Sequence, residues 1–239
     1  MKSATKISDW PRWWLMVIFA IAMAWVESAV VFYLRSMIDR IEPYQANPFP
    51  AIGGFAAVEL PREFATLVML LAVGLVAGRT WRARLGYAVI AFGVWDIFYY
   101  VFLKMICGWP HSLLDWDVLF LLPLPWWGPV LAPVLISTLM ILWSTLASQF
   151  EVTRNPALSN WRVWLLNFIG VALALYVFMA DTIIAAHRGS AAARTVLPVR
   201  FNWQLFIAAL SLMSAPLMKT GWQVLRRQRA KTAGAEPTE

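Results

Sequence analysis

The amino-acid sequence predicts an all-α fold, a bundle of six transmembrane helices, from three observations. Of the 239 residues, 61% are hydrophobic and only 14% are charged, whereas soluble domains are about one half apolar and one quarter charged. The mean hydropathy is +0.64. Apolar stretches of about 20 residues, the length that crosses a hydrocarbon core as a helix, recur six times. Because lipid offers the backbone no hydrogen bonds, stretches of this length are expected to be helical.

The six expected helices form one transmembrane domain over residues 1–225, and both chain ends then lie on one side of the membrane. With the N-terminus inside, thirteen of the 20 Lys and Arg residues fall on the cytoplasmic side, which predicts an N-in, C-in topology. Residues 226–239 are polar and are expected to form a disordered cytoplasmic tail. The expected helices are Trp13–Arg35, Arg62–Ala77, Arg84–Cys107, Gly128–Ser148, Trp161–Ala186 and Trp203–Leu225.

Proline shapes the connection between the first two helices, residues 36–61, which contains four prolines and two adjacent glycines. This composition denies the connection a continuous helix. Pro61 suits the first turn of the second helix. Glu63, directly behind it, is then also interpretable as a carboxylate that stabilises a helix N-terminus.

A second proline-rich segment precedes the fourth helix, at residues 118–127. It is apolar, yet Pro123 and Pro125 interrupt it. Irregular backbone at membrane depth is tolerated only where protein or a water-filled cavity covers it. We therefore expect a broken or re-entrant helix that lines a cavity. The alternative is a helix lying flat in the outer headgroup zone, with Asp115 and Asp117 as its caps.

Ionisable residues inside the expected helices gather in the outer half of the bundle. Glu27 and Asp96 lie at similar depths, and Tyr100 and Lys104 follow Asp96 at helical spacing. Such residues are costly in lipid and commonly functional, which predicts an outward-facing polar pocket. The alternative is that they are only interhelical ties, Asp96 with Lys104 or Arg35 and Glu27 with Tyr99 or Arg62. The candidate ligand-binding residues are Glu27, Glu63, Asp96, Tyr100, Lys104 and Asp117; no catalytic residue is assigned.

Several other classes of protein find no support in the sequence. There is no phosphate-binding glycine loop or nucleophile elbow, and no cofactor is expected. His111, His187, Asp115, Asp117 and Asp181 offer chemically suitable metal ligands, but they lack a recognised spacing and no metal is predicted. The net charge of +7 sits mainly at helix ends, where it suits anionic lipids. Membrane lipids, and also other membrane-protein subunits, are therefore the expected partners, and nucleic acid is not.

The most distinctive segments are Gly93–Lys104, Gly108-Trp109-Pro110, Asp115-Trp116-Asp117 and Leu122–Pro133. In these segments the chain resembles a group of bacterial polytopic membrane proteins without an assigned activity. The resemblance covers about residues 1–140, including Trp25-Val26-Glu27 and Arg62-Glu63. It implies a bacterial inner (cytoplasmic) membrane location and nothing about chemistry.

These observations predict an integral inner-membrane protein whose polar pocket makes it a ligand-binding or accessory component. Two other functions stay open. The first is a membrane-embedded enzyme that acts on an amphiphilic lipid or isoprenoid, with Asp96 or Glu27 as general acid or base. The second is a proton- or ion-coupled transporter that uses the same carboxylates.

Overall fold

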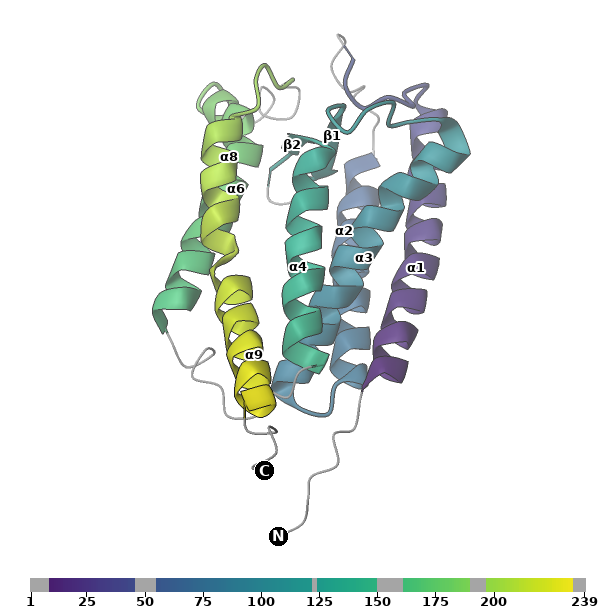
Figure 1. The fold of residues 1–239 in the computed structure, drawn as a ribbon. Coiled ribbons are helices and arrows are strands. Elements are labelled where there is room, and N and C mark those ends of the chain that lie inside the picture. The colour runs from purple at the N-terminus through teal and green to yellow at the C-terminus, as the bar shows by residue number, and fades with distance from the viewer. Residues whose placement is uncertain (1–8, 46–54, 122–123, 150–160, 190–196, 234–239) are drawn as a thin grey trace, which may run out of the picture.

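The computed structural model describes residues 9–45, 55–121, 124–149, 161–189 and 197–233. Six helical spans in the described residues are long and apolar enough to cross a membrane, which confirms the predicted number. The first helix begins, and the last helix ends, at the same end of the bundle (Figure 1); we call this the termini end and the opposite one the hairpin end. The helices are α1 (Trp10–Met37), α2 (Phe55–Ala77), α3 (Trp81–Cys107), α4 (Leu131–Gln149), α6 (Trp161–Ala186), α8 (Trp203–Met213) and α9 (Ala215–Ala233).

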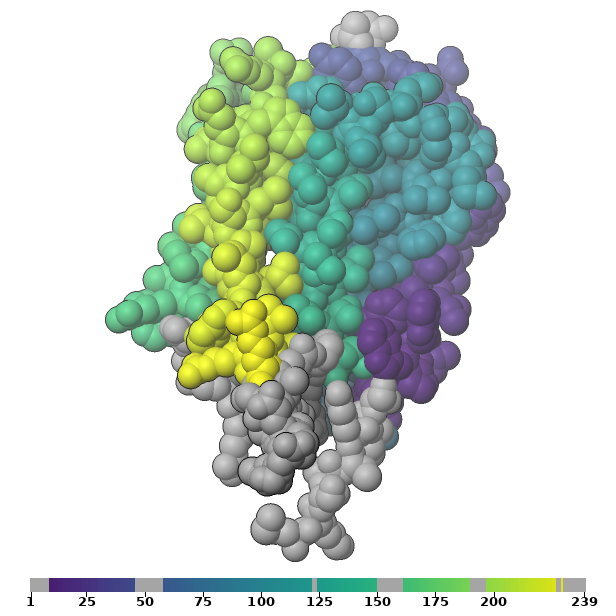
Figure 2. Space-filling view, viewed as in Figure 1, coloured from purple at the N-terminus to yellow at the C-terminus, as the bar shows by residue number. Residues whose placement is uncertain are grey.

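Helix α3 is the centre of the larger part of the bundle, because it packs against α1, α2 and α4. Helices α6 and α8 pack mainly on each other and reach the rest through β2, α4 and α9. Figure 2 shows α8 and α9 running beside α4 on one face of the molecule. The bundle thus has two parts, which contact each other through α4 and α9.

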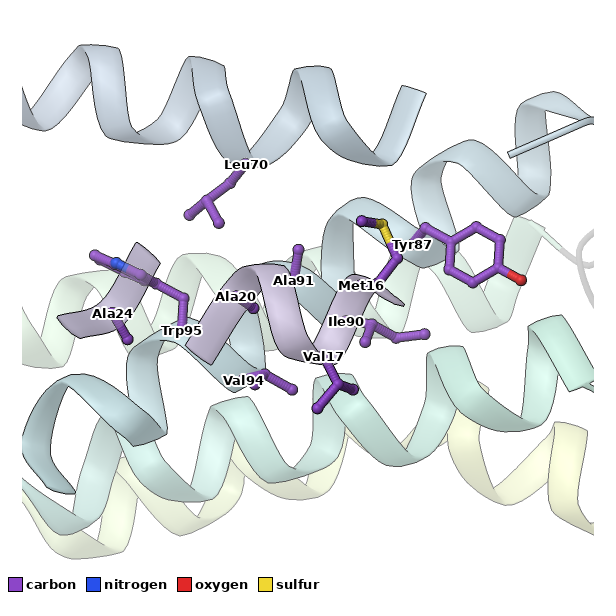
Figure 3. Packing of buried hydrophobic residues seen from close by; sticks show 10 residues of the cluster. All are labelled: Met16, Val17, Ala20, Ala24, Leu70, Tyr87, Ile90, Ala91, Val94 and Trp95. Carbon is purple, nitrogen blue, oxygen red and sulfur yellow. The ribbon is translucent and has the colours of Figure 1, made fainter. Parts of the chain in front are cut away.

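The largest hydrophobic cluster lies between α1, α2 and α3 (Figure 3). Alanines supply much of the contact between α1 and α3, since Ala20, Ala24 and Ala91 are all fully buried. Small side chains let helix backbones approach closely, which is how helices gain packing energy in lipid. Tyr87 closes this cluster toward the termini end.

Helix α2 begins earlier than expected. It starts at Phe55 and contains Pro61, so the prediction that Pro61 opens the helix was wrong. Proline lacks an N–H and removes one hydrogen bond to the residue four positions back. The loss falls within the first two turns, where Glu59 and Arg62 hold the helix on both sides of Pro61 through an ion pair.

The sixth span consists of two helices, α8 and α9, that meet at Ser214. Helix α9 continues to Ala233, beyond the expected end at Leu225. Residues 226–233 are therefore helical and the expectation of a disordered tail was wrong for them, while residues 234–239 lie outside the described residues. Lys, Arg, Gln and Ala in this stretch are strong helix formers, which extends the helix past its apolar part.

The segment before α4 is a β-hairpin, and the prediction of a helix there was wrong for the residues that the structure describes. Strands β1 (Trp116–Phe120) and β2 (Trp126–Pro129) pair antiparallel, with Asp117 opposite Gly128. Aromatic and β-branched residues favour strands, and the prolines disfavour a helix. Asp115 caps no helix; its carboxylate accepts the backbone N–H groups of His111 and Ser112 in a turn.

Candidate functional site

Polar side chains gather beneath the hairpin, in two neighbouring clusters. The glutamate cluster consists of Glu27 on α1 and of Glu59, Arg62, Glu63 and Thr66 on α2. The aspartate cluster consists of Arg35 on α1, Asp96, Tyr99 and Tyr100 on α3, Asp117 on β1 and Ser137 on α4.

The glutamate cluster arises from helical spacing on α2. Residues 59, 62, 63 and 66 are separated by three or four positions, which places them on one side of a helix. Glu59, Glu63 and Thr66 are all buried, and Leu70 continues the same face toward the termini end. The inward face of α2 is therefore polar over its first turns and apolar beyond them.

Arg62 is the shared cation of the glutamate cluster. Its guanidinium forms ion pairs with Glu27 and Glu59, and the Thr66 hydroxyl donates a hydrogen bond to Glu27 Oε2 at 3.2 Å. The ion pair of Glu27 with Arg62 is one of the interhelical ties that the sequence suggests. It joins α1 to α2 within the hairpin-end half of the bundle.

Glu63 has a different partner from the other two glutamates. Both of its carboxylate oxygens accept the backbone N–H of Leu121, at 3.2 and 3.0 Å. Leu121 directly follows β1, so this contact ties α2 to the hairpin. A neutral N–H leaves the negative charge of an ionised Glu63 without a counter-charge of its own.

The aspartate cluster joins the hairpin to α1. Arg35 Nη2 lies 2.8 Å from Asp117 Oδ1 and donates to the Tyr99 hydroxyl at 3.3 Å. The same guanidinium stacks over the Trp109 ring, with 4.5 Å to the ring centroid. Arg35 thus connects α1, α3 and the hairpin through one side chain.

Asp117 is 1% exposed, and burial raises the pKa of its carboxyl group, while Arg35 and the Val118 N–H lower it. The Tyr100 hydroxyl approaches the same carboxylate and also favours its charged form. Among the described residues, however, Asp117 Oδ2 has no partner in hydrogen-bond geometry. The hydrogen bonds of normal geometry at this buried carboxylate are therefore concentrated on Oδ1.

Asp96 lies deeper in the bundle and is buried. Its Oδ2 accepts a hydrogen bond from Ser137 Oγ at 2.8 Å, which links α3 to α4. Within the described part of the chain Asp96 forms no ion pair, so the suggested ties to Lys104 and Arg35 are absent there. A neutral hydroxyl is the partner that the structure gives this carboxyl group.

The structure brings together five of the six predicted site residues. Glu27, Glu63, Asp96, Tyr100 and Asp117 are all buried or half-buried in the two clusters. Lys104 is not among them, because it is exposed and its Nζ donates to the carbonyl oxygen of Gly108 at 2.7 Å, at the end of α3. Ligand binding by these residues stays a prediction.

Sequence reasoning missed Glu59, Thr66 and Ser137. Glu59 precedes Pro61, in a stretch interpreted as irregular, although its spacing to Arg62 and Glu63 follows helical periodicity. Ser137 carries no charge, and nothing in its immediate sequence distinguishes it from a serine that bonds its own helix backbone. Helical periodicity could have identified Glu59 from the sequence. No local sequence signal could have identified Ser137.

The described residues contain no group of three His, Cys, Asp or Glu side chains arranged to hold a metal ion. Of the five metal-ligand candidates, His111 and Asp115 lie beside each other, whereas Asp117 and Asp181 have other partners. His111 is exposed and lies 3.6 Å from Asp115, whereas Asp181 accepts the backbone N–H of Val199 at 3.2 Å.

Fold and site together describe a polytopic helical protein, compatible with an integral membrane location, that has polar clusters within its apolar bundle. A comparison with known proteins found no matching family model, no matching curated protein and no matching solved structure. The bacterial inner membrane and the N-in, C-in orientation remain predictions from the sequence.

Proposed function

We propose that this protein is a multi-pass inner-membrane protein, N-in and C-in, that binds a cationic ligand at the outward-facing hairpin end. It would act there as a ligand-binding or accessory component. The observation that carries the proposal is the composition of the glutamate cluster, in which two carboxylates pair with one guanidinium and a third, that of Glu63, accepts only a backbone N–H among the described residues.

The charge of the two clusters is unbalanced. Glu27 and Glu59 pair with Arg62, whose charge also acts on Glu63. In the neighbouring cluster Asp117 pairs with Arg35, while Asp96 bonds a neutral serine hydroxyl. A buried charge without a counter-charge is strongly unfavourable in an apolar surrounding. A bound cation or a bound proton would remove this penalty, and either would make the surplus carboxylates the reactive part of the site.

The arrangement favours an organic ammonium group over a metal ion as the ligand. The described residues present no set of three side chains suited to a metal, while an ammonium group needs only dispersed acceptors and negative charge. Tyr99 of the aspartate cluster stacks on Trp95, with 6.3 Å between the ring centroids. Aromatic faces attract ammonium groups. Glu63 is the principal acceptor in this proposal, because no cation pairs with it in the described residues.

Thermal unfolding of the purified protein in detergent tests the proposal, with its 15 tryptophans as the fluorescent reporter. Alkylammonium and polyamine salts are titrated against sodium chloride at constant ionic strength. A ligand that binds only the folded state stabilises it by RT ln(1 + [L]/Kd). We expect a saturable rise in melting temperature, weakened about tenfold in affinity by Glu63→Gln, since one charge-assisted contact is worth about 1.4 kcal/mol or more.

The matched control is Glu42→Gln, because Glu42 is an exposed carboxylate at the same end of the bundle. It should leave the titration unchanged. If no organic cation raises the melting temperature above the sodium control, the proposal is wrong. If Glu42→Gln weakens the effect as much as Glu63→Gln, the cations act on the surface charge and the proposal fails as well.

Proton- or ion-coupled transport is the second candidate, and Asp96 favours it. A buried carboxyl group whose described partner is a neutral serine hydroxyl can exchange a proton without breaking an ion pair. Proteoliposomes that carry a pH-sensitive dye inside test this function. Cation-dependent proton movement that disappears in Asp96→Asn would support transport, and equal dye signals with and without protein would exclude it.

A further inference from the structure

A second set of buried polar atoms lies at the termini end, far from the clusters beneath the hairpin. Native proteins leave few buried polar atoms without a hydrogen-bond partner, and each one calls for an explanation. Among the described residues there are seven such side-chain atoms, and four belong to the termini ends of α1, α3, α4 and α9. These four atoms are Arg12 Nη1, the Tyr87 hydroxyl, Gln149 Oε1 and Gln223 Oε1.

Tyr87 is the innermost of the four residues, with 0% exposure. Figure 3 shows its ring at the edge of the hydrophobic cluster, with the hydroxyl pointing away from the other nine side chains. The Gln149 carboxamide approaches this hydroxyl, and Asp9, Arg12 and Arg79 are close enough to act on it electrostatically. None of them forms a hydrogen bond of normal geometry with it.

The helices around Tyr87 are held in place by a separate contact. Trp13 Nε1, one residue after Arg12, donates to Thr145 Oγ1 of α4 at 2.9 Å, and Thr145 lies one turn before Gln149. Helix α9, which carries Gln223, packs against α4. Figures 1 and 2 show the start of α1 and the chain of α9 at the same end as the last turn of α4. Helix α4 thus contacts each of the three other helices that carry an unpartnered atom.

The charge of this end is positive. Arg12, Arg79, Arg82 and Arg84 lie at or next to it, and Asp9 is the only acidic residue among the described residues of this end. Arg12 Nη1 lies 3.6 Å from Asp9 Oδ1, and the Arg12 side chain is 31% exposed. The Arg12 side chain therefore reaches the surface of this end, whereas Tyr87 is fully buried.

We infer that Arg12, Tyr87 and Gln149 form a binding site for a phosphate group at the membrane surface, carried by a lipid headgroup or present as free phosphate. Arginine supplies the charge and a donor geometry that suits phosphate. The Tyr87 hydroxyl supplies a second donor. The unpartnered Gln149 atom is its carbonyl oxygen, while its N–H₂ donates to Ser148 Oγ at 3.5 Å, so this carboxamide must turn to present its N–H₂ to a phosphate oxygen. This site is independent of the proposed function, because it uses other residues at the other end of the bundle.

Thermal unfolding of the full-length protein in detergent tests the inference with three additives. These are short-chain phosphatidylglycerol, a diacylglycerol of the same chain length without phosphate, and inorganic phosphate against chloride at equal ionic strength. We expect phosphatidylglycerol to raise the melting temperature saturably and diacylglycerol to have no effect. If inorganic phosphate reproduces the rise, the site takes free phosphate; if it does not, the site requires a lipid headgroup.

Tyr87→Phe is the decisive variant, because it removes only the unpartnered hydroxyl. Without additive it should be neutral or slightly stabilising, since it deletes a buried group that has no partner. With phosphatidylglycerol its apparent affinity should fall about tenfold, the loss expected for one hydrogen bond to a charged group. Arg12→Gln should lower the affinity further, and Gln149→Leu provides a second variant if Arg12→Gln does not fold.

Tyr176→Phe is the matched control, because Tyr176 is half-exposed on α6; it should keep the wild-type affinity. The inference is overturned if Tyr87→Phe and wild type bind phosphatidylglycerol and phosphate equally well. It is also overturned if diacylglycerol stabilises the protein as much as phosphatidylglycerol, since the acyl chains then account for the effect. In either case the four atoms are hydrated and bind no phosphate.

Discussion

Arg35 of α1 and Asp117 of β1 form a buried ion pair, with 2.8 Å between Nη2 and Oδ1. The two residues are 82 positions apart in the chain, and the pair fixes the hairpin to the first helix. Because Glu63 binds the backbone just after β1, the hairpin is held from α1 and α2 at once. The hairpin therefore covers the polar clusters and takes part in both of them.

Breaking this ion pair should destabilise the protein strongly. Removal of one partner leaves the other charge buried and uncompensated, which typically costs about 3–5 kcal/mol. We expect Arg35→Gln to lower the free energy of unfolding by about this amount, measured by tryptophan fluorescence during denaturation in mixed micelles. Asp117→Asn should cost less, because burial already favours the uncharged form of this carboxyl group. The double variant should lose less than the sum, because neither charge then stands alone.

Lys104→Gln is the control for this experiment, since Lys104 is an exposed cation that contacts a backbone carbonyl. Its effect should stay below about 1 kcal/mol, as for exposed polar contacts in general. Strictly additive effects of Arg35→Gln and Asp117→Asn would contradict a direct interaction between the two side chains.

The stability of the protein should depend on pH through Asp117. Burial raises the pKa of this carboxyl group in the folded state, whereas in the unfolded chain it is about 3.9. At pH values between the unfolded-state pKa and the higher folded-state pKa, the folded state binds more protons than the unfolded state. The free energy of unfolding therefore falls as pH rises through this range. One group contributes at most about 1.4 kcal/mol per pH unit.

Melting temperatures of wild type and Asp117→Asn across this pH range measure the effect. Asparagine does not titrate, so the difference in stability between wild type and variant should shrink steadily as pH rises from about 4. A difference that is constant with pH, or that grows as pH rises, would show that Asp117 keeps an ordinary or lowered pKa.

Most of the fold is predictable because it depends on one strong physical constraint. Lipid imposes helix on every long apolar stretch, and all six expected spans are helices in the structure. The hairpin escaped prediction because its apolar residues suit either structure, and the pairing of Asp117 with Gly128 is set by tertiary contacts. The start of α2 was misplaced because proline was interpreted as a boundary, although the helix runs through Pro61.

The sequence predicted which residues belong to the site better than it predicted which residues they contact. Ionisable residues are energetically unfavourable in lipid, so Glu27, Glu63 and Asp117 stand out in an apolar sequence. All three lie in the two polar clusters. Their partners depend on how the helices are rotated and on where the hairpin crosses them. For this reason the contact of Asp96 with Ser137 could not be derived from spacing along α3.

Asp96 and Ser137 should respond to mutation in opposite ways. Asp96→Asn keeps an oxygen that can accept the Ser137 hydroxyl and removes a charge that has no ion-pair partner in the described residues. We expect it to be neutral or stabilising in detergent. Ser137→Ala removes a hydrogen bond to a buried carboxyl group, which costs about 1–3 kcal/mol.

Thr138→Ala is the control for Ser137→Ala, because the Thr138 hydroxyl is exposed and bonds only the α4 backbone among the described residues. It should change stability by less than about 1 kcal/mol. A larger loss of stability in Asp96→Asn than in Ser137→Ala would mean that the charge of Asp96 is compensated, which contradicts the surplus on which the proposed cation site depends.

Gly170 should be the most sensitive glycine between α6 and α8. A Cβ atom there would lie 2.7 Å from the Ala209 carbonyl oxygen and 2.9 Å from the Met213 nitrogen. Both are backbone atoms, so the two helices must separate to accept alanine. We expect Gly170→Ala to lower the free energy of unfolding by about 1–3 kcal/mol, the usual cost of overpacking. Gly221 in α9 is the matched control, because a Cβ atom there meets nothing within 4 Å and Gly221→Ala should be neutral or stabilising by up to about 1 kcal/mol. Equal effects of the two substitutions on thermal unfolding would show that α6 and α8 do not pack backbone to backbone at Gly170.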